Sequence, residues 1–304
     1  MTIKEFATID KSLYPLLLNE SRYSPKQLYA AGTLPPPTTS DGDRSVQYTG
    51  VAMVGTRKPG RNAEELCRRL VFSLRGTRAI IVSGLAQGID SLCHEAALEA
   101  GLPTIAVLAQ GLATNIEGSR GELAKRILDA GGAIVSDFAP DMPAYKSNFP
   151  SRNRIIAGMS GATLIVQSRE KGGALLTGDF CRRDKRPLFA IPGNFDSEVS
   201  SGTNQLLDRG LAKPVFCPES LRSLLGFPKE GGQSLSKLSS IGCNLSERAK
   251  TFFSKVNGFR KTFDELQAEN DFKTSELLAI LTELEIAGLA HTDDNLYFHF
   301  NGVA

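Results

Sequence analysis

The sequence lacks the features of a protein that enters or crosses a membrane. No apolar run approaches the roughly eighteen residues that a membrane span needs. Residues 1–11 mix charged with apolar side chains, and they have neither the basic start nor the continuous apolar stretch of a secretion signal. We therefore expect a cytoplasmic protein that does not bind membranes.

Cysteine and histidine are too scattered for a disulfide framework or a metal site. The five cysteines lie far apart and form no C-x-x-C pair, and the three histidines have no ligand-like neighbours. The Walker A pattern G-x-x-x-x-G-K-[ST] does not occur, and the first glycine loop lacks the dinucleotide pattern G-x-G-x-x-G. The sequence thus predicts no metal and no cofactor.

Charge is nearly balanced, because the formal net charge is only +2. Two segments are nevertheless basic: Tyr145–Arg154 holds cations and no acid, and Cys181–Pro187 holds four cations and one acid. Either segment alone is equally well explained as a solvated face of the protein.

The length of 304 residues predicts two domains preceded by a shorter segment. Residues 1–48 form that N-terminal segment, which ends in a linker or exposed loop rich in Pro, Ser, Gly and Asp at Leu34–Ser45. Within it, Tyr14–Leu18 and Leu28–Leu34 are candidate short edge strands.

The middle region, residues 49–225, predicts an α/β fold. Short runs rich in Val and Ile, typical of strands buried on both faces, alternate with helical patterns such as Arg61–Arg75 and Asp90–Ala100. The alternation predicts a Rossmann-like, doubly wound, mostly parallel sheet. The strand runs are Val51–Val54, Ile80–Ser83, Thr104–Leu108, Ala133–Ser136, Thr163–Val166 and Leu188–Ile191.

The C-terminal part predicts a small winged-helix domain at residues 243–304, after a Gly/Ser/Lys-rich linker at 226–242. The third helix has one cation and three acids, so we expect it to contact protein rather than duplex DNA. The helices are expected at Ser246–Val256, Thr262–Glu269 and Lys273–Gly288, and the hairpin strands at Leu289–His291 and Leu296–Phe300 flank a turn at Asp293–Asn295.

Small residues follow the predicted strands, at the edge of the sheet where open parallel sheets bind ligands. Glycines let a phosphate approach the backbone, and N–H groups at helix starts bind anions. Arg57 can add a positive charge and bidentate hydrogen bonds. Any one such loop is explained as a tight turn, whereas several converging loops favour phosphate binding. The residues are Gly55, Thr56 and Arg57, then Ser83, Gly84, Ala86 and Gly88, then Gly111, and finally Gly172, Gly173 and Thr177.

The block Lys146–Gly158 combines cations, amides and the aromatic Phe149 just before a predicted helix. Phosphates attract the cations, and an unpaired base stacks on a flat apolar face. The alternative is that Phe149 is a core residue and the arginines are surface charges of a helix.

Asp90 and His94 lie four residues apart on one predicted helix face. They could form an acid–base pair, but no nucleophile or metal motif accompanies them. We interpret both as structural residues: Asp90 as a helix cap and His94 as a buried hydrogen-bonding group.

Over residues 49–216 the order and spacing of these motifs resemble the DNA-processing protein A (DprA/Smf) family. The most specific block is Phe149–Gly158, and the C-terminal module resembles the family's winged helix. Matching blocks are Val54–Arg57, Ser83–Asp90 with His94, Thr104–Leu108, Phe149–Gly158, Phe189–Gly193 and Ser201–Asn204.

The resemblance implies a non-catalytic protein that binds single-stranded DNA in a basic pocket. It implies a homodimer that protects DNA and loads the RecA recombinase in natural transformation (competence) and homologous recombination. By motif position, Arg57 contacts phosphate and Lys146 and Phe149 contact the strand. Arg152 and Asn153 line the same pocket, whereas Arg154 anchors its helix internally.

The chain departs from the family at Gln87, where the family usually has a basic residue, at Ala113–Ile116, where a Tyr-Pro pair is usual, and at Gln167–Ser168, in place of Glu-Ala. Two alternatives stay open. One is a nucleotide-binding sensor. The other is a nucleoside-monophosphate hydrolase. Such enzymes use a Pro-Gly-Gly-x-Gly-Thr loop, and Lys171–Ala174 partly resembles it.

Overall fold

The computed structural model describes residues 1–34, 49–227, 245–256, 260–268, 272–287, 289–292 and 297–300. The chain divides into two compact units, Met1–Phe227 and Pro228–Ala304. Most of the two predicted linkers, residues 35–45 and 228–242, and the predicted turn at 293–295 lie outside the described residues.

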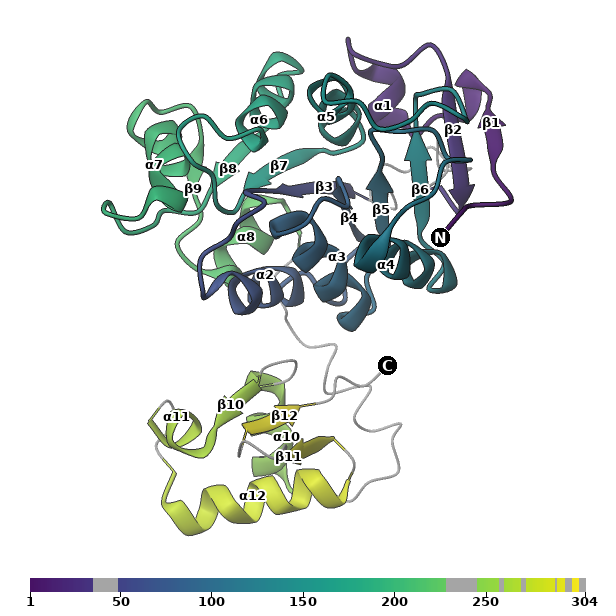
Figure 1. Cartoon of the computed structure of the whole chain (residues 1–304). Coiled ribbons are helices and arrows are strands. Elements are labelled where there is room, and N and C mark those ends of the chain that lie inside the picture. Colours follow the sequence, from purple (N-terminus) through teal and green to yellow (C-terminus); the bar gives the residue numbers. More distant parts are fainter. Residues whose placement is uncertain are drawn as a thin grey trace. The chain divides into compact units, whose positions relative to one another are not determined.

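A mostly parallel sheet forms the centre of the first unit (Figure 1). In the described residues its strand order is β1-β2-β6-β5-β4-β3-β7-β8-β9, and the strands β3 to β9 are parallel to one another. This confirms the doubly wound sheet, and all six predicted runs form strands. The parallel strands are β3 Thr49–Val54, β4 Ala79–Ser83, β5 Thr104–Val107, β6 Ala133–Ser136, β7 Ala162–Ile165, β8 Leu188–Ala190 and β9 Lys213–Pro214.

The N-terminal residues belong to this sheet rather than to a separate segment. Strand β1, Ala7–Ile9, pairs with β2, Leu28–Gly32, and β2 pairs antiparallel with β6. The predicted strand at Leu28–Leu34 is therefore confirmed. The one at Tyr14–Leu18 is wrong, because Pro15 precedes a short helix, α1 Leu16–Glu20, and proline fixes a backbone angle that suits a helix start.

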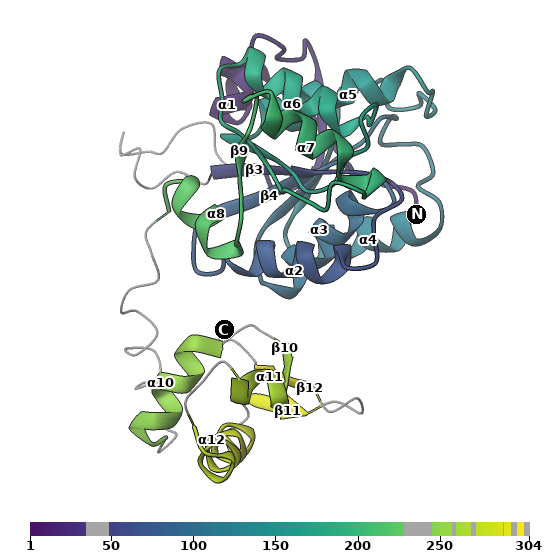
Figure 2. The same ribbon diagram turned by 90° about the vertical axis from the view of Figure 1, so that its left-hand side faces the viewer.

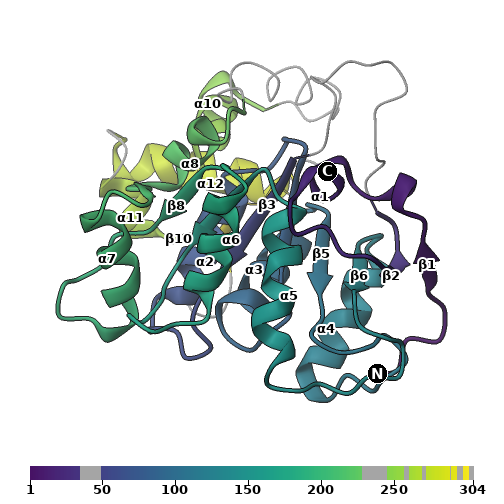
Figure 3. The same cartoon turned by 90° about the horizontal axis from the view of Figure 1, so that it is seen from above.

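Two helical layers cover the sheet, as the views from the side and from above show (Figures 2 and 3). Alternate residues of each strand serve the two layers: Val51 and Met53 pack with α2 and α3, whereas Ala52 and Val54 pack with α5. This is why the strand sequences are continuously apolar. One layer holds α2 Ala63–Phe72, α3 Ile89–Glu99, α4 Gly118–Asp129 and α8 Pro218–Leu224, and the other holds α1, α5 Asn148–Gly158, α6 Ala174–Arg183 and α7 Ser201–Asp208.

The winding direction reverses between β3 and β7, which are neighbours in the sheet. From β3 the chain builds β4, β5 and β6 on one side, and it then returns to place β7, β8 and β9 on the other. The loops that follow β3 and β7 therefore diverge at the carboxyl edge and leave a crevice, which is where such sheets bind ligands.

The second unit has its own apolar core around Phe252, Phe253 and Leu281. The Ser246 hydroxyl accepts a hydrogen bond from the Ala249 N–H at 3.2 Å, as expected of a helix cap. Strand β10 was not predicted. The three expected helices and the two hairpin strands are present in the described residues, and the winged helix stays a prediction. The elements are α10 Glu247–Val256, β10 Arg260–Thr262, α11 Phe263–Ala268, α12 Thr274–Ile286, β11 Ala290–Thr292 and β12 Tyr297–Phe300.

None of the helices in the described ranges of either unit combines the length and the apolar content required to cross a bilayer.

His94 is fully buried on α3, where it links this helix to β5. Its Nδ1 lies 2.7 Å from Thr104 Oγ1, and the Thr104 hydroxyl donates to the Ile81 carbonyl at 2.8 Å. Because the single hydroxyl proton is used on Ile81, Nδ1 must donate, and the ring is neutral with an unpaired Nε2. Burial, aided by the charge of Arg152, lowers the pKa of His94 to about 3.

Acid should therefore destabilise the first unit through His94. Its folded pKa of about 3 lies below the ordinary value of 6.5, so the proton binds the unfolded chain and stability falls as the pH drops from 6.5 towards 3. Between pH 7 and pH 4.5 this group should remove roughly 2–3 kcal/mol of unfolding free energy. Urea titrations of wild type and His94→Gln at both pH values test this. An equal pH-dependent loss in the two proteins would contradict it.

Candidate functional site

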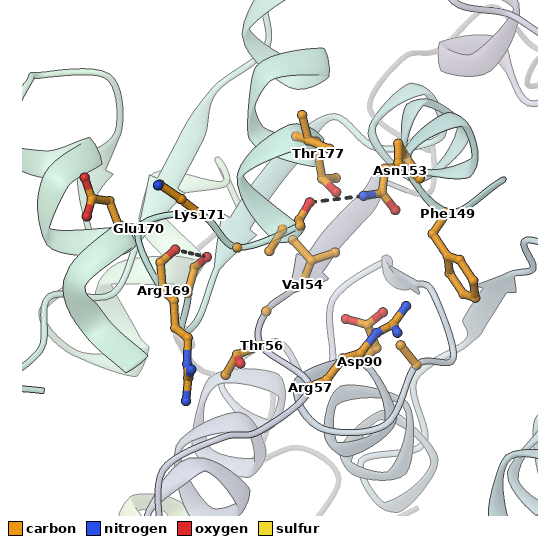
Figure 4. Close-up of a pocket in the computed structure, with 18 of the residues that line it drawn as sticks. Val54, Thr56, Arg57, Asp90, Phe149, Asn153, Arg169, Glu170, Lys171 and Thr177 are labelled. Atoms are coloured by element: carbon orange, nitrogen blue, oxygen red, sulfur yellow. Dashed lines mark hydrogen bonds between the residues drawn. The ribbon is translucent and has the colours of Figure 1, made fainter. Parts of the chain in front are cut away.

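A cavity of about 540 Å³ opens in the crevice between the loops after β3 and β7 (Figure 4). The N-terminal turns of α5 and α6 complete its walls. The structure brings ten of the predicted site residues together here. They are Gly55, Thr56, Arg57, Ala86, Phe149, Arg152, Asn153, Gly172, Gly173 and Thr177.

Asp90 changes the interpretation of the first two glycine loops. It is not the cap of α3, as predicted, because Gly88 with a φ of +91° occupies the cap position. Instead its buried carboxylate accepts hydrogen bonds from the backbone N–H groups of Gly55, Gly84 and Ala86. Burial raises the pKa of Asp90, and Arg152 and these N–H groups oppose the rise. An internal carboxylate thus takes the N–H groups that we expected a phosphate to use.

Arg152 also differs from its predicted role. Its side chain lies in the cavity floor, and the residue is only 3 % exposed. Nη1 donates to the carbonyl oxygens of Gly84, at 2.5 Å, and Val107, and Nε donates to Asn153 Oδ1 at 3.1 Å. Burial lowers the pKa of Arg152 to about 10, and the guanidinium remains charged at neutral pH. It ties the loops after β4 and β5 to α5 and presents little surface to a ligand.

The block that we expected before a helix itself forms the start of α5, because the helix begins at Asn148. The Asn148 amide donates to the Ala109 carbonyl at 3.1 Å, which fixes this end of the helix. Arg154 donates to the Tyr23 carbonyl at 2.6 Å and pairs with Asp137. Arg154 therefore holds α5 against the N-terminal residues and points away from the cavity.

Arg57 and Phe149 form the accessible part of the site. The Arg57 guanidinium carbon lies 4.6 Å from the centre of the Phe149 ring, a cation–π contact between the loop after β3 and α5. Arg57 is exposed and Phe149 is partly exposed. A cation beside a flat aromatic face suits a phosphate next to an unpaired base.

The start of α6 supplies the second anion-binding element. Its cap is Gly173, which has no side chain, and Gly172, Gly173 and Thr177 all face the cavity. The Leu175 and Leu176 N–H groups donate to the Gly172 and Gly173 carbonyls, and the Asn153 amide donates to the Gly173 carbonyl at 3.2 Å and so joins α5 to this turn (Figure 4). The dipole of α6 therefore favours a negative ligand group here.

Five predicted site residues do not line the cavity: Ser83, Gly84, Gly88, Gly111 and Lys146. The Ser83 hydroxyl donates to the Met53 carbonyl at 2.6 Å, and the Gly111 N–H donates to the Met142 carbonyl at 2.8 Å. Gly84 packs against Arg152, and Gly88 packs against the backbone of Thr56 and Arg57. Lys146 is exposed in the turn before α5.

The sequence analysis missed most of the polar side chains on the wall that follows β7, although it predicted Gly172, Gly173 and Thr177 there. Arg169 pairs with Glu198 at 2.9 Å across this wall. The position directly after the second switch-point strand was the signal that could have identified it. Within the ranges that the structure describes, no group of three or more His, Cys, Asp or Glu residues could hold a metal ion. The missed polar residues are Ser168, Arg169, Glu170, Lys171, Glu198 and Ser201.

Two glycines of this region should respond differently to a methyl group. A Cβ on Gly84 would collide with the Arg152 guanidinium, whereas a Cβ on Gly173 would meet nothing within 4 Å. We expect Gly84→Ala to lower the unfolding free energy by about 1–3 kcal/mol. Gly173→Ala should stay within about 1 kcal/mol of wild type. Chemical denaturation measures both, and an equal response would contradict the proposed packing of Arg152.

Comparisons with known proteins agree with the fold and the motifs. Residues 5–226 match the family model of DNA recombination-mediator protein A. Protein Smf of Escherichia coli is 34 % identical over 220 residues, which are 72 % of this chain and 59 % of that protein. DNA processing protein DprA of Streptococcus pneumoniae is 31 % identical over 208 residues, or 67 % of this chain and 68 % of that protein.

Solved structures extend this similarity. The X-ray structure of DNA processing protein A from Streptococcus pneumoniae has a TM-score of 0.63 at 29 % identity, covering 74 % of this chain and 75 % of that one. A structure of the Helicobacter pylori protein, determined for its single-stranded DNA binding mode, has a TM-score of 0.61 at 27 % identity, covering 73 % and 96 %. By the match over residues 5–226, the chain belongs to the DNA recombination-mediator protein A (DprA/Smf) family.

Proposed function

We propose that the first unit binds single-stranded DNA at this cavity. The observation that carries the proposal is the contact of Arg57 with Phe149 at the cavity, which the N-terminus of α6 also lines. One strand can then place a phosphate against Arg57, a base against Phe149 and a further phosphate at α6. Lys146, exposed just before α5, adds a cation for the strand on leaving the cavity.

The wider role follows from the relatives. The Helicobacter pylori protein of similar fold is described for its single-stranded DNA binding mode. This chain spans 59 % of the length of the Escherichia coli relative, so the activity of the whole protein is part of the proposal. We propose a cytoplasmic homodimer that holds single strands without catalytic turnover and loads the RecA recombinase in transformation and recombination.

The carboxylates of the cavity support binding over hydrolysis. Asp90 is occupied by three backbone N–H groups and Glu198 is paired with Arg169. Glu170 accepts a hydrogen bond from the Gln205 amide at 3.3 Å. Each acid that lines the cavity within the described residues is thus engaged, whereas a general base needs a carboxylate aimed at its substrate.

Fluorescence anisotropy of a labelled thymine oligomer across a salt series tests the proposal. Wild type should bind tightly at low salt and more weakly as salt rises. Arg57→Ala should weaken binding and flatten the salt dependence, because a phosphate contact is lost. Phe149→Ala should cost on the order of 1–3 kcal/mol of binding free energy, the value of one stacked base, with little change in slope.

Two variants serve as matched controls. Phe216 is 79 % exposed after β9, outside the cavity, and Lys125 is exposed on α4. Phe216→Ala and Lys125→Ala should bind like wild type. Wild type that ignores single strands but binds a mononucleotide would overturn the proposal in favour of a nucleotide sensor.

A further inference from the structure

The loop Gly84–Gly88, between β4 and α3, accepts hydrogen bonds from two arginine side chains of different helices. Arg152 of α5 donates to the Gly84 carbonyl at 2.5 Å. Arg120, in the first turn of α4, donates through Nε to the next carbonyl, that of Leu85, at 2.8 Å. The backbone of Arg57 packs against Gly88, whereas its guanidinium lies over the Phe149 ring.

Arg120 holds an unusual part of this loop. Leu85 has a φ of +52°, in the left-handed region that residues other than glycine seldom adopt. Its side chain is fully buried, and its carbonyl points to Arg120. The bond through Nε fixes the stem of the guanidinium. In the described part of the chain, neither terminal nitrogen of Arg120 has a hydrogen-bond or ion-pair partner.

Arg57, Arg120 and Arg152 repel one another around the loop. The acids that offset them are each engaged or hydrated: Asp90 accepts three backbone N–H groups, Asp137 pairs with Arg154, and Glu117, at the cap of α4, is exposed to water. Burial lowers the pKa of Arg120, and the charge of Arg57 lowers it further. Guanidinium groups that repel one another at a partly buried site are stabilised when an anion joins them.

We infer that Arg120 binds a backbone phosphate of the nucleic-acid strand where the strand leaves the cavity across the loop Gly84–Gly88. Arg120 is outside the cavity lining, whereas Ala86 of the same loop is part of it. Arg120 therefore provides a phosphate contact beyond Arg57, in the direction of α4. The inference rests on the proposed binding of single-stranded DNA.

Charge-changing variants on α4 test this role. Arg120→Gln should raise the Kd for a labelled thymine oligomer roughly tenfold at low salt, the effect of a lost charge-assisted contact. It should also reduce the slope of log K against log salt by about 0.7, the value for one phosphate of a single strand. Arg120→Lys should keep the slope and lose part of the affinity, because an ammonium keeps the charge but cannot make the two parallel hydrogen bonds of a guanidinium.

The matched control is Lys125→Gln, which removes the same charge from an exposed position of the same helix and should alter neither quantity. Melting temperatures of all variants exclude a general loss of folding. If wild type binds the oligomer and Arg120→Gln behaves like Lys125→Gln, the inference is overturned and the proposed function stands.

A second probe separates the two claims. Inorganic phosphate, against chloride of equal ionic strength, should raise the melting temperature of wild type more than that of Arg120→Gln. If wild type binds no oligomer, the proposed function fails. The phosphate-induced shifts in melting temperature of wild type and Arg120→Gln then remain as the test of an anion site at Arg120. Equal or absent stabilisation by phosphate in the two proteins would then overturn the role of Arg120.

Discussion

Asp90 and Arg152, two buried groups of opposite charge, are the constraint on which the site depends. Asp90 accepts N–H groups from the loops after β3 and β4, and Arg152 donates to carbonyls at the end of β4 and of β5. At the edge where the three parallel strands β3, β4 and β5 end, Asp90 thus satisfies backbone N–H groups and Arg152 satisfies backbone carbonyls. Removing either partner would leave a buried charge without its counter-charge, which costs far more than an exposed pair contributes.

This arrangement determines how a ligand can be held. In a phosphate-binding glycine loop the backbone N–H groups bind the anion directly. Here Asp90 uses those of the first two loops, so binding shifts to the start of α6 and to side chains at the rim, Arg57 and Phe149 above all. Side-chain cations bind phosphates through exchange of counterions, and affinity built this way depends strongly on salt. It also tolerates many sequences, since a stacked ring accepts any base.

The sequence predicted the sheet well because burial on both faces leaves a plain signal, as in Val51–Val54 and Ala133–Ser136. It missed β1, whose three residues are largely exposed and whose place depends on pairing with β2. It also placed Phe149 just before a helix, whereas α5 begins at Asn148 and includes Pro150. Proline is tolerated in a first helical turn, where its missing N–H has no partner within the helix.

The site residues divide in the same way. Arg57 and Phe149 could be assigned from chemistry and position, but nothing local distinguishes the buried Arg152 from an exposed arginine. Its burial follows from Gly84 and Val107, which are 68 and 45 residues away in the chain and adjacent only in the folded sheet. The place of Arg169 at the cavity could not be predicted for the same reason, because it pairs with Glu198 of a later segment.

The distribution of charge in the cavity gives a bound strand a preferred side. On the β7 and α7 side, Glu170 and Glu198 offset the cations Arg169 and Lys171. On the side of β3 and α5, Arg57 and Arg152 face only Asp90, whose charge is enclosed by N–H groups. An anionic polymer therefore gains more along the second side, which continues through Lys146 before α5 and Arg120 on α4. In the proposed complex the bases would then turn towards Phe149, because most of the phosphates follow the arginines and one lies at the start of α6.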